Sequence, residues 1–437
     1  MIGLKAYRLP GSNMSKIWFH FHGGAREVGN VGCTIQKANC ETILIDYGLA
    51  ASKPPRYPSP TPHVKNAVIT HAHIDHIGMA PWLVGHHGTK LHSTPLVAAL
   101  SEIMWRDTYK VSSIEGYPLT WDKRDIEDSL ESWITHDHGE PFDLSGWTCT
   151  LRGAGHVPGA SMVELKTPDV KILWTGDIDT RSSPNVEGAK PVECDILVME
   201  ATYAGRDHTD RATEEDRLVS RVQDIRARGG VALIPSFASG RGQDIIKILH
   251  DRDPSLNVHY DGMGTRVSRI WNDHPSYIRD PSGFEKALRW TKRVRGKSDR
   301  FKALEADVIV TTSGMLDGGP AIWYLNRLRH DSANAILLTG YQAPGSGGRS
   351  LVDTRIISIY NRKTRIELEI DKFDLSNHAG RSELVDFARA CNPRHLILFH
   401  TPDEDVEEFA DLFGPDPPFE VLIPNNGRDL IIDIDAE

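Results

Sequence analysis

The chain has 437 residues, of which 39% are hydrophobic and 25% charged, a composition typical of folded domains rather than of disordered chains. The net charge of −10 argues against a protein that holds a polyanion through its overall charge, although a local basic groove or a metal site can outweigh that average. No apolar run reaches the roughly 18 residues of a membrane span, the N-terminus lacks the apolar core of a signal peptide, and the five cysteines are scattered without a C-x-x-C, so we expect a reduced, cytoplasmic protein.

The first predicted strands are short and apolar. They cover residues 17–22, 32–36 and 42–46, and the third ends on Asp46 before a Pro-rich loop. A carboxylate at such a turn either supports a nearby functional loop or is a plain turn residue, and the strand pattern alone is compatible with both.

Four potential metal ligands follow the next predicted strand, residues 67–70. They fall within six residues, His71-Ala72-His73-Ile74-Asp75-His76, so one short loop presents three imidazoles and a carboxylate. Imidazole nitrogen and carboxylate oxygen are the ligands that zinc accepts besides thiolate. We therefore predict a metal site here. The alternative, a polar loop of solvated or capping histidines, is disfavoured because later His and Asp residues also follow apolar runs.

Helical spacing over residues 91–109, with Pro95 as the start signal, predicts one helix, and spacing over residues 121–134 predicts a second. The strands that follow end at residues suited to metal binding or proton transfer, namely His156 in a Gly-rich loop, Asp177 and Glu200. Some other histidines have no partners in this pattern and are predicted to be structural: His20, His22, His136 and His138.

The pattern changes near residue 205, where strands and helices begin to alternate. This alternation predicts a parallel sheet with covering helices, and we interpret residues 205–350 as a separate α/β domain. It is inserted between two parts of the first domain, residues 1–204 and 351–437. In the second part, strand ends again present candidate site residues, His378 and His400.

Together these residues resemble the metallo-β-lactamase superfamily and its β-CASP branch of nucleases. The superfamily signature is matched in order and spacing by His71-x-His73-x-Asp75-His76, His156, Asp177 and His400. Three further motifs of the β-CASP branch are matched by Glu200, His378 and His400. Two more runs are most similar to the cleavage-and-polyadenylation-specificity-factor nucleases and their short prokaryotic relatives without a KH domain: Ser313-Gly314-Met315 and Thr339-Gly340-Tyr341-Gln342.

The resemblance covers almost the whole chain and implies a fold and a cofactor. The implied fold is α/β, a four-layer αβ/βα metallo-β-lactamase sandwich with an inserted α/β β-CASP domain. The implied cofactor is two Zn²⁺ ions per chain, with Mn²⁺ or Mg²⁺ as possible substitutes. One ion would bind His71, His73 and His156, the other would bind Asp75, His76 and His400, and Asp177 would bridge both. We expect Asp46, which matches the family's first motif, to support the metal loop rather than to bind metal.

The activity implied by the resemblance is hydrolysis of RNA phosphodiester bonds, by endonuclease or 5′-to-3′ exonuclease cleavage, in RNA processing or decay. Two divalent ions about 3.5–4 Å apart suit in-line phosphoryl chemistry, because they activate water and neutralise charge on the phosphoryl oxygens. The implied catalytic residues are Asp75, Glu200 and His378. His378 would protonate the leaving 3′-oxygen, with Glu200 orienting it, so the products would carry a 5′-phosphate and a 3′-hydroxyl.

Three polar loops are candidates for binding the nucleic-acid backbone. They contain Arg241 beside a predicted helix N-terminus, Ser313 and Gly314 after a strand, and Arg349 in a Gly-rich stretch. For each loop, ordinary helix capping or turn geometry explains the residues as well as phosphate binding does.

Three other functions agree less well with these residues than a ribonuclease does. DNA nucleases of the same superfamily typically have valine where this chain has His400, so the histidine favours RNA. A small-molecule metallohydrolase needs neither the long insertion nor the Glu200 and His378 pair. A non-catalytic RNA-binding scaffold is disfavoured because all the ligand positions are intact. The expected partner is single-stranded RNA, and no association with a membrane is expected. Homodimerisation is common in the family.

Overall fold

The computed structural model describes residues 15–50, 52, 54–415 and 418–435. A first seven-stranded sheet has the order β22-β1-β2-β3-β4-β5-β6. Its strands are β1 (Lys16–Gly23), β2 (Gly32–Lys37), β3 (Ile43–Ile45), β4 (Asn66–Val68), β5 (Lys90–Ser93), β6 (Trp133–Thr135) and β22 (Asp429–Asp433).

A second seven-stranded sheet packs against the first. Its order is β21-β20-β11-β10-β9-β8-β7. Its strands are β7 (Pro141–Leu144), β8 (Trp147–Gly153), β9 (Ser161–Lys166), β10 (Lys171–Trp174), β11 (Ile196–Glu200), β20 (His395–Phe399) and β21 (Glu420–Leu422). Phe21 of β1 stacks on Trp174 of β10 at 5.9 Å between ring centroids, and Trp174 lies 4.4 Å from Phe399 of β20. These fully buried rings belong to the apolar core between the two sheets.

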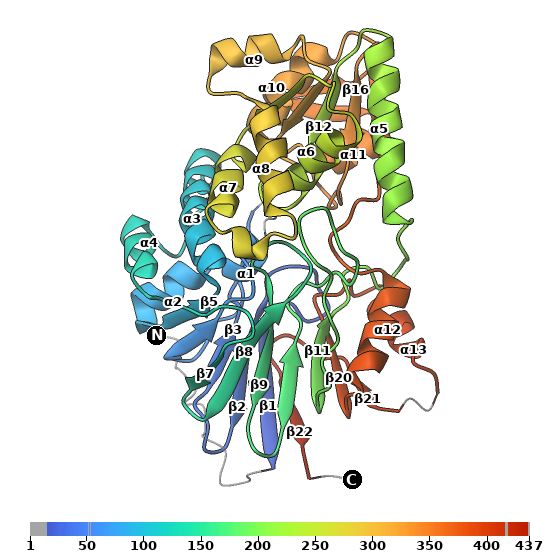
Figure 1. The fold of residues 1–437 in the computed structure, drawn as a ribbon. Helices are drawn as coiled ribbons and strands as arrows, with labels where there is room; N and C mark the ends of the chain where they lie inside the picture. The colour runs from blue at the N-terminus through green and yellow to red at the C-terminus, as the bar shows by residue number, and fades with distance from the viewer. Residues whose placement is uncertain (1–14, 51, 53, 416–417, 436–437) are drawn as a thin grey trace.

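Helices cover the outer faces of the two sheets (Figure 1). On one side lie α1 (Ile74–Ile77), α2 (Ala80–His87), α3 (Pro95–Glu115) and α4 (Lys123–Leu130), and on the other side α12 (Arg381–Cys391) and α13 (Val406–Asp411). The predicted α/β fold class is confirmed, with helices outside two face-to-face sheets.

A third, six-stranded sheet forms the core of the upper part of the molecule in Figure 1. All its pairs are parallel, in the order β14-β13-β15-β12-β16-β19. Its strands are β12 (Ala232–Pro235), β13 (Val258–Asp261), β14 (Lys292–Arg293), β15 (Val308–Thr311), β16 (Ala335–Leu338) and β19 (Glu369–Lys372). Four of them are buried at every position, as expected of parallel strands covered on both faces: β12, β13, β15 and β16.

The elements around this sheet are mostly helices. They are α5 (Arg211–Ala227), α6 (Arg241–Arg252), α7 (Gly264–Asn272), the 3₁₀ helix η1 (Pro275–Tyr277), α8 (Pro281–Trp290), α9 (Lys297–Ala303), α10 (Gly319–Leu328) and α11 (Gly347–Thr354). A two-stranded ribbon of β17 (Ile356–Ile359) and β18 (Arg362–Arg365) follows α11. The last strand of the third sheet, β19, comes after residue 350 and pairs with β16. The domain boundaries stay a prediction, but this sheet extends past the range 205–350.

One predicted helix is displaced along the chain, and another is shorter than its apolar spacing suggested. The helix predicted over 91–109 begins at Pro95, because Leu91 belongs to β5 and the Thr94 side chain caps the helix by accepting from the Val97 amide. The helix predicted over 121–134 covers only Lys123–Leu130, and its last predicted residues form β6. In both cases strand pairing within the first sheet competes successfully with helical spacing.

The buried His92 makes the fold acid-sensitive. His92 is 5% exposed, its Nε2 lies 2.9 Å from Asn66 Oδ1, and its Nδ1 lies 3.1 Å from His136 Nε2. With Nε2–H donating to the amide oxygen, Nδ1 accepts from His136 Nε2–H, and a second proton on Nδ1 would require His136 to change its tautomer. Burial, aided by the neighbouring His136, lowers the pKa of His92 to about 4.

Because the pKa of His92 is lower in the folded state, the unfolded state binds more protons as the pH falls below about 6.5. The contribution of neutral His92 to the free energy of unfolding is therefore fully present above that pH, and it is lost as the pH falls towards 4. Between about pH 7 and pH 5 the wild-type chain should lose about 2 kcal/mol of unfolding free energy through His92. His92→Gln should not show this part of the loss, and urea denaturation at both pH values measures it. An unchanged pH dependence in the variant would remove His92 from this account.

Candidate metal centre

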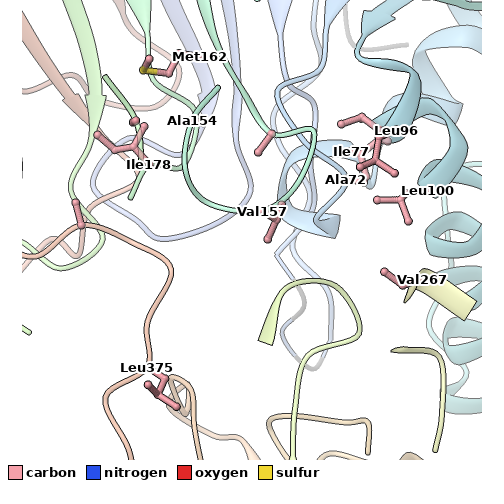
Figure 2. Packing of buried hydrophobic residues seen from close by; sticks show 14 of the residues in the cluster. Ala72, Ile77, Leu96, Leu100, Ala154, Val157, Met162, Ile178, Val267 and Leu375 are labelled. Atoms are coloured by element: carbon pink, nitrogen blue, oxygen red, sulfur yellow. The ribbon is translucent and has the colours of Figure 1, made fainter. Parts of the chain in front are cut away.

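The loops that carry the predicted ligands are anchored in apolar core. Ala72 and Ile77 flank the middle of the histidine-rich loop, Val157 follows His156, and Ile178 follows Asp177 (Figure 2). These apolar side chains are at most 4% exposed. Their burial fixes the backbone on either side of the ligands, so the polar side chains converge at one edge of the two sheets.

The first predicted ligand group is brought together by the fold. Nε2 of His71 and Nε2 of His156 each lie 3.1 Å from Nδ1 of His73. Asp177 Oδ2 lies 3.5 Å from the first of these nitrogens and 3.7 Å from the second. Ligand atoms around a tetrahedral zinc are separated by roughly 3.3 Å when the bonds are about 2.0–2.1 Å long, so this spacing fits a metal ion.

The second predicted group lies beside the first. His400 Nε2 is 3.5 Å from Asp75 Oδ2, and His76 Nε2 is 3.2 Å from Asp177 Oδ1. Atoms of Asp75, His76 and His400 lie within 4.8 Å of one another, as do those of the first group. Asp177 therefore directs one carboxylate oxygen to each group, which is the arrangement of a bridging ligand.

Buried polar atoms without hydrogen-bond partners test whether these residues fit a metal. His76 Nε2 and Asp177 Oδ1, which face each other at 3.2 Å, and His400 Nε2 are buried, and none forms a well-oriented hydrogen bond among the described residues. An unpartnered buried nitrogen or oxygen costs about 1–3 kcal/mol, and three at one place are rare without an ion. A divalent cation would satisfy all three, so the donor set fits the metal that the sequence predicts.

A second hydrogen bond orients each of three ligand imidazoles. His76 Nδ1 lies 2.8 Å from Asp46 Oδ2, and His400 Nδ1 lies 2.8 Å from Thr202 Oγ1. His156 Nδ1 donates to the Asn377 carbonyl oxygen at 2.7 Å. In His76 and His156 the proton lies on Nδ1, so the lone pair of Nε2 is directed into the site.

The pKa values of two first-group histidines fit metal binding, since only neutral imidazole is a ligand. Burial is the main cause that holds the pKa of His71 well below its ordinary value, and the neighbouring His76 adds to it. Burial and the neighbouring His378 do the same for His156. Both side chains are therefore neutral at pH 7.

Glu200 and His378 lie at the side of the metal cluster. His378 Nδ1 is 2.8 Å from Glu200 Oε1, and His378 Nε2 is 3.9 Å from Asp177 Oδ2. Glu200 is fully buried and is held by backbone amides of Ile178 and Thr202, at 3.0 and 2.8 Å. Burial disfavours the charged imidazole, but the Glu200 carboxylate outweighs burial and raises the pKa of His378 to about 9. Glu200 therefore favours the charged form of His378, next to the cluster.

Asp46 has the place expected of a supporting residue. It has a positive φ of 55°, and its Oδ1 accepts from the Thr70 amide at 2.8 Å, directly before the histidine-rich loop. We expect Asp46→Asn to weaken metal affinity by about 10–100-fold, because the amide holds His76 less firmly. Competition with a chromophoric chelator measures the affinity. Equal affinity in a variant with unchanged circular dichroism would show that Asp46 is a plain turn residue.

The predicted substrate-binding residues differ in exposure. Arg241 is 7% exposed and donates from Nη1 to Asn377 Oδ1 at 3.1 Å, so it belongs to a buried polar network rather than to an open surface. Ser313 is half-buried and Gly314 is buried. Arg349 is exposed but its Nε forms an ion pair with Asp353 at 2.7 Å. Contact with RNA stays a prediction for all four.

Sequence reasoning missed the residues that orient the ligands. Thr202, Asn377 and Ser239 contact ligand histidines, the last through its carbonyl oxygen at 3.4 Å from His73 Nε2. Thr202 and Asn377 stand within two residues of Glu200 and His378, and that proximity is the one signal in the sequence. A backbone carbonyl such as that of Ser239 leaves no signal in the residue type.

Three segments of the chain match known protein families. Residues 28–219 match the metallo-beta-lactamase superfamily, residues 244–351 match the Beta-Casp domain, and residues 363–424 match the Zn-dependent metallo-hydrolase RNA specificity domain. The chain belongs to the β-CASP ribonuclease branch of the metallo-β-lactamase superfamily. Like the other members of this branch, it is a metal-dependent hydrolase that acts on RNA.

Relatives support this assignment over most of the chain. It is 34% identical to "Probable RNase MJ4" of Methanocaldococcus jannaschii over 394 residues, covering 87% of this chain and 92% of the relative. It is 31% identical to "RNase aCSPSF2" of Saccharolobus solfataricus, covering 93% of this chain and 84% of the relative. It is 30% identical to "Transcription termination factor FttA" of M. jannaschii, covering 90% of this chain and 68% of the relative.

A solved structure shares the fold of this β-CASP protein. A protein of unknown function from Enterococcus faecalis superposes with a TM-score of 0.62 at 13% identity, covering 95% of this chain and 100% of the other. None of the helices that the structure describes combines the length and the apolar character that a bilayer crossing requires. The cytoplasmic location stays a prediction.

Proposed function

We propose that this chain hydrolyses single-stranded RNA with two divalent ions, most naturally Zn²⁺, held in the two groups that share Asp177. One observation carries the proposal: the ion-paired Glu200 and His378 stand directly beside a cluster of seven metal-binding side chains. A cluster of this kind alone would suit many hydrolases. A protonated imidazole next to it is what cleavage of a phosphodiester with a poor leaving group requires.

His71, His73 and His156 would hold one ion, Asp75, His76 and His400 the other, and Asp177 both. Bound divalent ions supply Lewis acidity and a water of lowered pKa for in-line attack on phosphorus. The buried protein residues fix the ligand positions before substrate binds, since Asp46, Thr202 and Asn377 hold three of the imidazoles. Little reorganisation is then needed when charge develops on the phosphoryl oxygens.

His378 would donate its Nε2 proton to the 3′-oxygen as the phosphorus–oxygen bond breaks. Its Nδ1 is held by Glu200, so Nε2 is the nitrogen that faces the cluster. Glu200 Oε1 lies 2.8 Å from His378 Nδ1, so Glu200 would act by orienting His378 and keeping it charged. The expected products carry a 5′-phosphate and a 3′-hydroxyl.

RNA is the proposed substrate because the two RNases among the relatives cover most of this chain. The test is incubation of metal-loaded protein with end-labelled single-stranded RNA and with DNA of the same sequence, beside chelator-treated protein. We expect metal-dependent cleavage of RNA, slower cleavage of DNA, and 5′-phosphate ends on the downstream products. Equal cleavage of both polymers would contradict the RNA preference, and metal-independent cleavage would contradict the mechanism.

A further inference from the structure

The ribbon of β17 and β18 carries a local positive charge. Residues 355–365 contain three Arg, one Lys and neither Asp nor Glu, so they contribute +4 to a chain whose net charge is −10. The two strands form an antiparallel sheet of their own. A basic segment in an acidic protein is a place where a polyanion can bind despite the overall charge.

The cations of β18 are not engaged by the protein. Arg362, Lys363 and Arg365 are exposed, and no ion pair or side-chain hydrogen bond joins them to other residues in the described part of the chain. Nearby Arg349, in contrast, is paired with Asp353 at 2.7 Å. Three neighbouring exposed cations without carboxylate partners give this part of the surface a positive potential, which attracts anionic groups.

One face of the ribbon combines two of these cations with uncharged side chains. Ile356 pairs with Arg365, and Ser358 pairs with Lys363. Directly opposite residues of an antiparallel pair lie on the same face, and all four are exposed. This face therefore offers two cations about one strand repeat apart, roughly 7 Å, which is close to the spacing of successive phosphates in a single strand.

The tyrosine at position 360, in the turn of the ribbon, does not stabilise that turn. The turn residues Tyr360 and Asn361 have φ values of 49° and 65°, the combination found in type I′ hairpins. The first of these positions favours Asn, Asp or Gly, and a bulky ring is disfavoured there. The Tyr360 ring is 62% exposed, so packing does not offset that cost. A strained, exposed aromatic residue indicates a functional role.

A further group of aromatic and cationic side chains lies on α9 and α10. Burial lowers the pKa of Arg300 of α9, but Asp261, which accepts from its Nε at 2.7 Å, raises it on balance, and its guanidinium lies 5.9 Å from the Trp323 ring centroid. Beyond it, Arg327 of α10 stacks on Trp323 at 3.5 Å, and the adjacent Phe301 is 48% exposed. Exposed rings interleaved with guanidinium groups are typical of surfaces that bind single-stranded nucleic acid.

The base of the ribbon is packed against a loop that leads to the metal centre. The backbone at Gly347 lies close to both segments, because a Cβ atom at this position would be 2.4 Å from the Leu316 carbonyl oxygen and 3.3 Å from Ile357 Cδ1. Ile357 itself is buried. Leu316 belongs to the loop that contains Ser313 and Gly314. The third sheet's loops reach the cluster itself, since the Ser239 carbonyl contacts His73. The ribbon is thus packed on the same part of the chain whose loops reach the metal centre.

We propose that residues 355–365 are a second binding site for single-stranded RNA, with phosphates on Lys363 and Arg365 and a base stacked on Tyr360. The choice of RNA among polyanions rests on the proposed ribonuclease function, while the charge and the exposed ring are independent of it. This site binds a part of the RNA that lies outside the metal centre. It therefore increases the affinity only for RNA long enough to reach both the ribbon and the metal centre.

Binding tests the site directly. Anisotropy is measured with labelled single-stranded RNA of about 30 nucleotides, longer than a single site of about 4–16 nucleotides, on metal-loaded chain carrying His378→Ala to suppress cleavage. In that background Tyr360→Asn, which suits the turn better, is expected to weaken binding about five- to tenfold. Lys363→Ser with Arg365→Ser is expected to reduce the slope of log affinity against log salt by about 1.4.

The matched control removes two other exposed cations, Lys90→Ser with Lys166→Ser, and should leave the RNA affinity within about twofold. Affinity of the ribbon variants equal to that of this control would overturn the proposal. An altered sedimentation coefficient of the RNA-free ribbon variants, with RNA affinity unchanged, would also overturn it, because the ribbon would then be a contact between protein chains.

Cleavage kinetics in the otherwise wild-type chain give the second measurement. Tyr360→Asn should raise KM for the long RNA and leave kcat unchanged, and it should not affect a substrate of about six nucleotides that cannot span both places. Equal effects on both substrates would contradict a separate site. If the wild-type chain fails to cleave RNA but the binding differences persist, the proposed function fails and the ribbon site stands.

Discussion

Replacement of His378 by alanine is expected to lower kcat for RNA cleavage by about 10²–10⁴-fold, the range contributed by a positioned general acid. The 3′-oxygen of a phosphodiester is a poor leaving group, and the imidazole that would protonate it is held by Glu200 at 2.8 Å. His378 is not among the seven proposed ligands, so bound metal, measured by mass spectrometry of the desalted protein, should be unchanged. KM should change little, since the lost interaction is made in the transition state.

A substrate with a better leaving group distinguishes proton donation from a structural role. RNA with a sulfur atom in place of the bridging 3′-oxygen releases a thiolate, which needs no proton at neutral pH because thiol pKa values are about 8–9. The defect of His378→Ala should therefore largely disappear with this substrate. An equal loss on the oxygen and sulfur substrates would show that His378 holds the site together instead of donating a proton.

Replacement of Asp177 by asparagine is expected to reduce bound metal from two ions per chain to at most one and to lower kcat at least about 10³-fold. Asp177 Oδ2 faces His71 at 3.5 Å, and its Oδ1 faces His76 at 3.2 Å, so one carboxylate serves both groups. The amide offers only one oxygen and no charge. Both metal content and activity are measured on the same preparation.

A surface carboxylate gives the control for Asp177. Asp128 is half-exposed and lies 3.9 Å from the exposed Arg124, so Asp128→Asn should keep both ions and full activity. Two ions per chain in Asp177→Asn would show that Asp177 does not bridge. Full activity with one ion would contradict the two-metal mechanism.

The sequence was informative where chemistry depends on residue type. A loop with three imidazoles and a carboxylate, and strands that end at His156, Asp177 and His400, were sufficient to predict a metal site and to carry a family resemblance. The fold class and the grouping of the ligands followed from that resemblance. The pairing of Glu200 with His378, which are 178 positions apart, rested on family resemblance alone.

Other features depend on tertiary contacts that no local pattern carries. Arg241 looked like a phosphate-binding residue at a helix N-terminus, but the fold buries it against Asn377. Leu91 has helical spacing to the residues after it, yet it lies in β5 because β4 and β6 offer it strand partners. The exposed turn of the ribbon at Tyr360 became visible only with the backbone angles.

Metal titration of the chelator-treated protein tests the central claim most directly. Zn²⁺ is added in steps, and bound metal and the rate of RNA cleavage are measured at each step. Our account predicts little cleavage with one ion per chain, a rise to full activity as the second ion binds, and the release of a 5′-phosphate product. Full activity at one ion per chain, or cleavage without any ion, would contradict it.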